Sequence, residues 1–358
     1  MNFRPMLLKS IFAAVLLFAG VLLASKLYLK YGGLENTTDS NRLSNAASKD
    51  GIVWKNVEFK TVFRVERELR DAYPYDVRTD SRGHVYVLDI ANHRVLKFDS
   101  SGSLLRQWGR RGKGPGEFQM PARLFLDKDG GVIISDWSSG RISFFTPEGQ
   151  FLRTVKLPGM TQGVGVFSNG NLVVSVLFPQ EPFLREYNPD GKLLREFGRH
   201  LTPSHLYNQG RLVVDNNDDI YYWYDFLSAI LVYSREGKLL RTIDGPVVVK
   251  APDAAYKNPN LTARTDDEIW GTLDVSIDPR YVYVLFSGKR MSLKALVTGP
   301  TPDQSDIVHV FQKVDGRYLY SYRLPVVAKH FDVKFPYIHC VVHHPDVRLV
   351  KLQVIGIN

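Results

Sequence analysis

"YDVRTDSRGHVYVLDIANHRVLKFDSSGSLLRQWG", residues 75–109, contains four short runs of aliphatic and aromatic residues separated by turn-forming residues. Its last two runs meet at a hairpin around Gly102, where glycine suits the positive φ of a tight turn. The pattern returns in residues 122–157, 164–198 and 211–245, with turn glycines Gly149, Gly191 and Gly237. A repeat of 42 to 47 residues with four strands in each copy predicts a β-propeller, in which each copy forms one blade.

The rest of the chain carries two weaker copies of the repeat. Residues 273–286 and 306–324 supply the strands of a fifth blade, whereas 331–342 and 347–356 supply only three strands of a sixth. A seventh blade would have to lie in residues 246–272, which are rich in Pro and Asp and carry little strand signal. The repeats therefore predict six blades.

The strand missing from the sixth blade has a candidate donor near the start of the chain. Residues 57–66, "VEFKTVFRVE", place alternate side chains on one face: Val57, Phe59, Thr61, Phe63 and Val65. Adding this strand to the last blade closes the ring and removes two exposed sheet edges. We therefore predict that residues 51–358 form an all-β, six-bladed propeller whose last blade is closed by an N-terminal strand.

Two motifs in the first copies resemble a known family. Asp89-Ile-Ala-Asn92-His93-Arg94-Val95, followed by Phe98, resembles an NHL repeat, and "GKGPGEFQMP", residues 112–121, resembles the linker between such repeats. The match is specific in the first two copies, and only the periodicity survives in the last two. The resemblance implies a six-bladed propeller. It leaves function open, because relatives include protein-binding and nucleic-acid-binding scaffolds as well as propeller lyases and lactonases.

The glycine-rich stretch "GRRGKGPGEF", residues 109–118, raises the possibility of a phosphate-binding loop. It lacks the spacing and the Ser or Thr of a P-loop, and it lies between the first and second copies of the repeat. We interpret it as a connector between blades, with Phe118 packed on the core. Its cations Arg110, Arg111 and Lys113 are candidates for ligand binding at the rim.

The first 50 residues differ in composition from the repeats. Residues 1–31 have a charged start and an apolar run from Ser10 to Ser25, which predicts a signal anchor or a cleaved signal peptide. Residues 32–50 are polar and form a linker. We expect an exported propeller, either membrane-anchored on the periplasmic or cell-surface side or secreted after cleavage. The net charge of +9 favours acidic partners only weakly, and an exported protein is not expected to bind nucleic acid.

One column of residues in the predicted inner strands is polar. It contains Asp76, Arg123, Arg211, Asp274 and Asp332, and His330 lies close to its last member. Such a ring could bind a zwitterionic or anionic ligand, hold a divalent cation such as Ca²⁺ through Asp76, Asp274 and Asp332, or seal the channel with ion pairs. The arginines disfavour Ca²⁺, which prefers several oxygen ligands. No cofactor is predicted, and Ca²⁺ in the central channel is the one possibility left open.

Two other features bear on ligand binding. Residues 245–272 and 287–305 are longer than a blade connection requires, and Tyr256, Lys257 and Trp270 are candidate contacts. An arginine recurs on each of four outer strands, at Arg106, Arg153, Arg195 and Arg241, as part of a basic rim or of a solvated face. We predict a module that binds a protein, peptide or glycan through one rim. The alternative is a propeller enzyme, a lyase or a lactone or ester hydrolase, with its site in the central channel.

Overall fold

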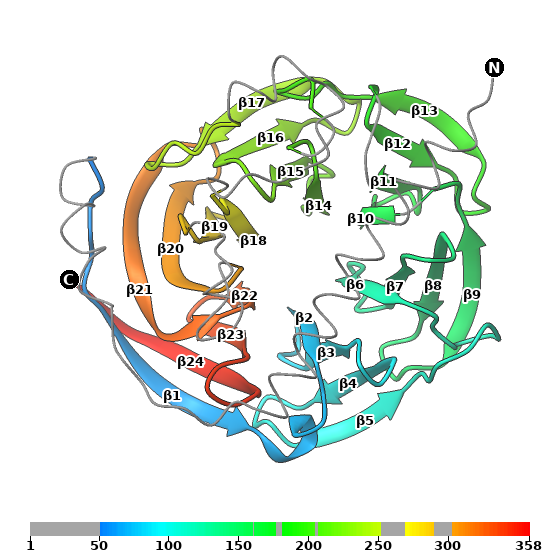
Figure 1. Ribbon diagram of the computed structural model, residues 1–358, viewed down its shortest axis with the longest axis horizontal. Helices are drawn as coiled ribbons and strands as arrows, with labels where there is room; N and C mark the ends of the chain where they lie inside the picture. Colours follow the sequence, from blue (N-terminus) through cyan, green and yellow to red (C-terminus); the bar gives the residue numbers. More distant parts are fainter. Residues whose placement is uncertain (1–50, 160, 177–180, 205–206, 252–268, 290–302) are drawn as a thin grey trace.

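A computed structural model describes residues 51–358, apart from 160, 177–180, 205–206, 252–268 and 290–302. These residues form six four-stranded antiparallel sheets arranged as blades around one axis (Figure 1). The prediction of an all-β, six-bladed propeller is confirmed. Within the described residues no helix is long and apolar enough to cross a membrane. The predicted signal segment (1–31) and linker (32–50) lie outside the described residues.

Blades 1 to 5 each run in chain order from an inner strand beside the axis to an outer strand at the circumference. Blade 1 comprises β2 (Pro74–Thr79), β3 (Val85–Asp89), β4 (Arg94–Phe98) and β5 (Leu104–Trp108). Blade 2 comprises β6 (Pro121–Leu126), β7 (Val132–Asp136), β8 (Arg141–Phe145) and β9 (Phe151–Lys156). Blade 3 comprises β10 (Thr161–Val166), β11 (Leu172–Val176), β12 (Leu184–Tyr187) and β13 (Leu193–Phe197). Blade 4 comprises β14 (Gly210–Val214), β15 (Ile220–Tyr224), β16 (Ala229–Tyr233) and β17 (Leu239–Asp244). Blade 5 comprises β18 (Thr272–Ile277), β19 (Tyr281–Phe286), β20 (Ser305–Gln312) and β21 (Tyr318–Ala328).

Blade 6 joins the two ends of the propeller. Its inner strands are β22 (His330–Lys334), β23 (Tyr337–Val342) and β24 (Arg348–Ile357), and its outer strand is β1 (Val57–Val65). β1 pairs antiparallel with β24, which confirms the predicted closure. A 3-10 turn, η2 (Arg67–Leu69), then leads the chain into blade 1.

The face predicted for β1 is interrupted at one point. The register with β24 shifts twice, between Glu58 and Phe59 and between Thr61 and Phe63, as in β-bulges, and the second shift falls where the face is interrupted. Thr61 is exposed as a result, whereas Val65 is buried and Phe63 packs with it against blade 1 residues. The alternation expected from residues 57–66 therefore holds on either side of the bulge and fails at Thr61.

The hydrophobic core lies between the blades. Tyr86 and Leu88 of blade 1, for example, pack with Leu124 and Ile134 of blade 2. Side chains alternate between the two faces of a strand, so each blade contributes to a core on either side. No blade buries its apolar surface alone, and the six blades are expected to fold as one unit.

The hairpin glycines contact the preceding blade as well as forming a turn. Gly149 has φ of +82°, and a Cβ there would lie 2.5 Å from the Trp108 ring on the outer strand of blade 1. Gly102 meets Phe63 of β1 in the same way, which carries the contact across the closure. The repeated glycine is required both by backbone conformation and by close packing.

The recurring arginines of the outer strands link neighbouring blades. Each donates a hydrogen bond to a backbone carbonyl in the hairpin of the next blade. The pairs are Arg106 to Glu148 (3.3 Å), Arg153 to Pro189 (2.5 Å), Arg195 to Glu236 (2.5 Å) and Arg241 to Lys313 (2.8 Å). Their role in the structure is therefore more specific than a solvated face, because each one joins two blades.

Candidate functional site

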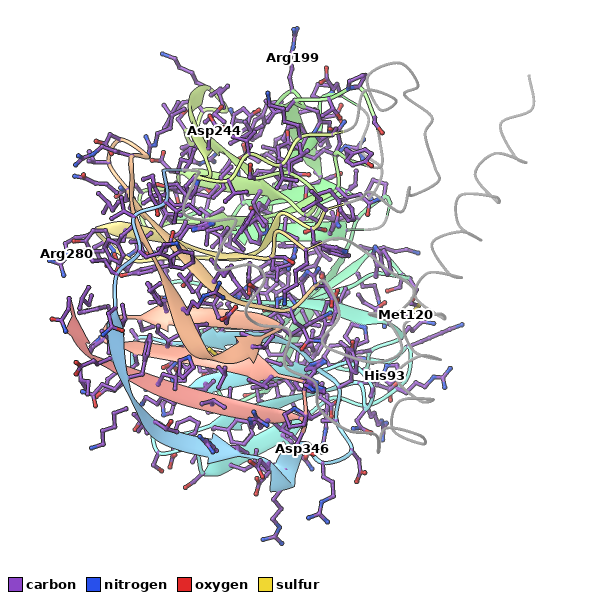
Figure 2. All side chains as sticks on the ribbon, turned by 60° about the vertical axis from the view of Figure 1, so that its left-hand side comes forward. His93, Met120, Arg199, Asp244, Arg280 and Asp346 are labelled. Atoms are coloured by element: carbon purple, nitrogen blue, oxygen red, sulfur yellow. The ribbon has the colours of Figure 1, made fainter. Side chains whose placement is uncertain are left out.

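All six inner strands begin at the same end of the propeller, which we call the entrance end. In Figure 2, Met120, just before β6, lies on the side opposite Arg280, which lies in the hairpin between β18 and β19. Near the entrance end each inner strand contributes a polar side chain: Asp76, Arg123, Gln162, Arg211, Asp274 and His330. We call this set the axial ring.

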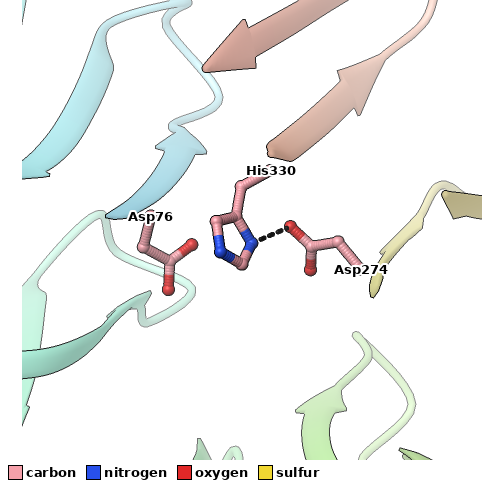
Figure 3. A group of neighbouring side chains, drawn as sticks. All are labelled: Asp76, Asp274 and His330. Atoms are coloured by element: carbon pink, nitrogen blue, oxygen red, sulfur yellow. Dashed lines mark hydrogen bonds and ion pairs between the residues drawn. The ribbon is translucent and has the colours of Figure 1, made fainter. Parts of the chain in front are cut away.

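Two carboxyl groups and an imidazole of the axial ring lie together. The donor atoms of Asp76, Asp274 and His330 lie within 4.8 Å of one another, and all three residues are buried. His330 Nδ1 lies 3.1 Å from Asp274 Oδ2, and the imidazole is placed between the two carboxyl groups (Figure 3). Burial lowers the pKa of His330 well below its usual value despite this contact.

The two carboxylates also join neighbouring blades. Asp76 Oδ2 accepts a hydrogen bond from the amide of Leu124 in blade 2, at 3.1 Å. Asp274 Oδ2 accepts one from the amide of Phe331 in blade 6, at 3.3 Å. Each carboxylate therefore satisfies a buried backbone donor of the next inner strand, which is a structural role.

Arg78 supplies the counter-charge for both carboxylates. Its Nη1 lies 3.1 Å from Asp76 Oδ1 and its Nη2 lies 3.5 Å from Asp274 Oδ1. Burial raises the pKa of Asp76, and the Asp274 carboxylate contributes to the rise. Asp274 is also buried, but Arg78 and the hydrogen bond from His330 hold its pKa well below its usual value. The sequence column omitted Arg78, although its position two residues after Asp76 places it on the same face of β2.

Asp332 lies apart from this group. Its carboxylate accepts hydrogen bonds from the Thr79 amide (2.8 Å) and from Ser276 Oγ (3.0 Å). His330 instead occupies in blade 6 the position that Arg123 occupies in blade 2. Asp274 accepts a hydrogen bond from the amide of the residue after His330, just as Asp76 accepts one from the amide of the residue after Arg123. The β22–β23 hairpin is shorter than the others, with Lys334 paired to Tyr337, so counting back from the turn selects the wrong residue.

A second group surrounds the ring of Tyr75. The Arg123 guanidinium lies 4.6 Å from the ring centroid, Lys329 Nζ lies 5.8 Å from it, and the His330 ring centroid is 5.2 Å away. Lys329 also contacts the Asp303 carboxylate. Burial, with the Arg211 and Arg123 charges, lowers the pKa of Lys329 to about 7. Arg211 itself pairs with Asp225 at 3.0 Å.

The connector of residues 109–118 binds its own carboxylate. Glu117 accepts hydrogen bonds from Arg110 Nε (2.7 Å) and from the Gly114 amide (2.8 Å). Phe118 is fully buried, as predicted. The groups that an external phosphate would need are partly occupied, so the structure supports the interpretation as a connector.

The rim candidates fall into three groups. Arg110, Arg111 and Lys113 are exposed on the connector that leads into β6. Trp270 is half-buried against Phe226, with ring centroids 4.8 Å apart. Tyr256 and Lys257 lie outside the described residues.

Comparisons with known proteins agree with this fold. Residues 73–175 match a family model, DUF5128, described as a 6-bladed beta-propeller. Peptidyl-glycine alpha-amidating monooxygenase of Mus musculus is 35% identical over 91 residues, which cover 23% of this chain and 9% of that protein. Protein brain tumor of Drosophila melanogaster is 27% identical over 134 residues, 36% of this chain and 13% of that protein. The chain thus spans a small part of the length of these relatives.

Solved structures resemble the chain over most of its length. Virginiamycin B lyase from Staphylococcus aureus superposes with a TM-score of 0.52 at 13% identity, covering 83% of this chain and 100% of the lyase. A Bacteroides fragilis protein, named as a candidate exported protein, gives 0.54 at 14% identity, covering 90% and 98%. At these identities the similarity establishes a shared propeller fold and carries no function with it.

Proposed function

We propose that this protein is an exported, membrane-tethered propeller that binds a protein, peptide or glycan at its entrance end. The observation that carries the proposal is the axial ring, because every blade contributes a polar side chain to one end of one axis. The ring itself is buried apart from Gln162, and the exposed cations of the β5–β6 connector, beside the start of β6, place charged groups at the surface of the same end. Rigid propellers often bind partners through such a rim, with specificity in the loops.

The binding proposal is tested by affinity capture from the native envelope with matched charge variants. One variant replaces Arg110, Arg111 and Lys113 with Ser at the entrance end. The control replaces Arg82, Lys128 and Arg280 with Ser, three exposed cations in hairpins at the opposite end. We expect the specific partner to be lost only from the first variant. Equal retention by both variants would count against binding at the entrance end.

Tethering rests on the apolar run of residues 10–25, and fractionation tests it. We expect the protein to stay with membranes in high salt and to be released by detergent. Release by salt alone would exclude an anchor.

The finer family assignment, to NHL repeats, is also part of the proposal. The Asp89 carboxylate accepts hydrogen bonds from Arg94 Nε (2.8 Å) and the Tyr73 amide (3.0 Å), so part of the motif ties β3 to the start of the inner strand. Asp136 of blade 2 accepts from the Gln119 amide in the same way. Homologues that lack these residues while keeping the fold would contradict the assignment.

A second function, a propeller lyase or a lactone or ester hydrolase, is favoured by the Asp274–His330 contact. A carboxylate that orients an imidazole is a common arrangement for a general base. In this alternative Asp76, with its raised pKa, could serve as the acid. Turnover of a lactone or ester that disappears in His330→Gln but survives in Arg106→Gln would replace the binding proposal.

A divalent cation fits the axial ring poorly. Its carboxylates already face the Arg78 guanidinium, and the third donor is an imidazole where Ca²⁺ prefers oxygen. We propose that Arg78 takes the place of a metal here. Metal analysis of the purified protein tests this, and a stoichiometric divalent ion that Asp274→Ala removes would overturn it.

A further inference from the structure

Arg123 differs from the other cations near the axis because its charge has no ionic partner in the described part of the chain. Only 8% of Arg123 is exposed, yet its Nε makes no hydrogen bond there. Its Nη1 donates to the carbonyl of Ala122 at 3.1 Å. By contrast, Arg78, Arg211 and Lys329 each pair with a carboxylate. The carboxylate that interacts with it, Asp76, lies beyond ion-pair distance and already pairs with Arg78, so an incoming anion would complete the pairing of a buried guanidinium.

The surroundings of Arg123 extend this positive region. Two cations lie beside the Tyr75 ring, with the Arg123 guanidinium 4.6 Å and Lys329 Nζ 5.8 Å from the ring centroid. Arg123 and Arg211 both disfavour the charged form of Lys329, in addition to burial. Arg123 and Lys329 therefore lie together between blades 1, 2 and 6, where Tyr75, Arg123 and Lys329 originate, although Lys329 also contacts Asp303.

We propose that Arg123 and Lys329, which both lie beside the Tyr75 ring, bind a carboxylate group of the ligand. The proposal rests on the proposed binding function and gives it a chemical class. A guanidinium offers two parallel donors to a planar carboxylate, and Arg123 has its Nε still available. A phosphate dianion is less suitable, because the Asp76 carboxylate is close enough to Arg123 for the two charges to interact.

The test uses the full-length protein in detergent, with sodium acetate as the probe. Thermal unfolding and calorimetric titration at pH 6 are compared for acetate, phosphate and chloride at equal ionic strength. We expect acetate to raise the melting temperature above the chloride value, and Arg123→Gln or Lys329→Met to weaken acetate binding at least tenfold. Arg106→Gln, a change on an outer strand, should leave it unchanged.

Three results would overturn the proposal. Phosphate could bind more tightly than acetate, Arg123→Gln could bind acetate as wild type does, or no anion could bind better than chloride. If Arg123→Gln does not fold, Arg123→Lys is used, because it keeps the charge but lacks the two parallel donors of the guanidinium. Unchanged acetate affinity in that variant would contradict binding through those two donors.

Envelope capture separates this proposal from the proposed function. If acetate fails to bind while the entrance-end charge variant still loses the partner, only the carboxylate proposal fails. If that variant also keeps the partner, the binding function fails with it.

Discussion

Arginines at the circumference and arginines at the axis belong to the same repeats but use their donors differently. Arg195, on β13, donates to the Glu236 and Arg235 carbonyls and pairs with Glu186 at 2.6 Å. Arg123, on β6, is more deeply buried and donates one hydrogen bond, to the residue before it. The outer arginines recur and bind carbonyls of the next blade, which indicates a role in holding blades together, even though Arg241 also leaves its Nε unpaired. Arg123 combines an unused donor with burial at the axis and with the absence of any such link, and this combination indicates a place for a ligand.

The carboxylates of the axial ring share features of structural groups and of binding groups. Asp76 and Asp274 accept backbone hydrogen bonds from the next blade, as structural groups do. They also enclose His330 and share Arg78. Burial alone therefore does not separate a structural group from a binding group, and mutants must be compared in pairs.

The largest effect is expected at the circumference, from deletion of residues 51–65. The deletion removes β1 and with it the contacts of Phe63 and Val65 with blade 1. Burial of such side chains contributes about 1.5–3 kcal/mol each, so the total loss is comparable with the stability of a typical domain. We expect no cooperative unfolding transition by circular dichroism. Removal of residues 1–50 is the control, and a melting curve equal to the control would contradict the role of the closure.

At the axis, Asp274→Asn should destabilise the domain by about 3 kcal/mol, because it leaves Arg78 and its neighbours with less counter-charge in a buried site. Urea unfolding measures the effect. Asp306→Asn is the matched control, since the Arg323–Asp306 pair is partly exposed and should contribute under about 1 kcal/mol. Equal effects in the two variants would mean that Asp274 has little structural role, which would strengthen the enzymatic alternative.

The sequence was sufficient for the fold because the repeat is local. Turn glycines and alternating strands recur within each blade, so Gly102 to Gly237 set the count of regular blades. The closing strand was predictable from its alternation and from the three strands of the last blade. The bulge at Thr61 was not, because it depends on the register with β24.

The candidate site was only partly predictable, because it depends on register between blades. Counting residues back from the hairpin after each inner strand identified ring positions where the hairpins have similar lengths, as for Asp76 and Arg123. It failed in blade 6, where the hairpin is shorter, so that His330 and not Asp332 lies in the ring. Lys329 and Tyr75 carry no motif, and their place beside Arg123 follows from contacts between blades 1, 2 and 6. Arg78 could have been found from strand alternation alone.

Among the outer arginines, Arg195→Met should have a larger effect than Arg106→Met. Arg195 contacts a buried carboxylate, Glu186, and hydrogen bonds from Arg235, Asn171 and Arg195 lower the pKa of Glu186 to about 2 although burial opposes this. Arg106 makes one exposed contact, to the Glu148 carbonyl at 3.3 Å. We expect losses of about 2 kcal/mol and under about 0.5 kcal/mol in urea unfolding. The reverse order would show that the links between blades do not depend on the buried carboxylate.

The smallest effect on stability is expected for Arg123→Met, although Arg123 is more deeply buried than Arg106 and Arg195. Methionine keeps an apolar contact with Tyr75 and removes a buried charge that has no ionic partner among the described residues. Replacing a poorly compensated buried charge by an apolar residue is often neutral or stabilising. We expect the free energy of unfolding to change by less than about 0.5 kcal/mol, or to rise, in chloride buffer. A loss as large as that of Arg195→Met would place Arg123 with the structural arginines, and the contrast between axis and circumference would then fail.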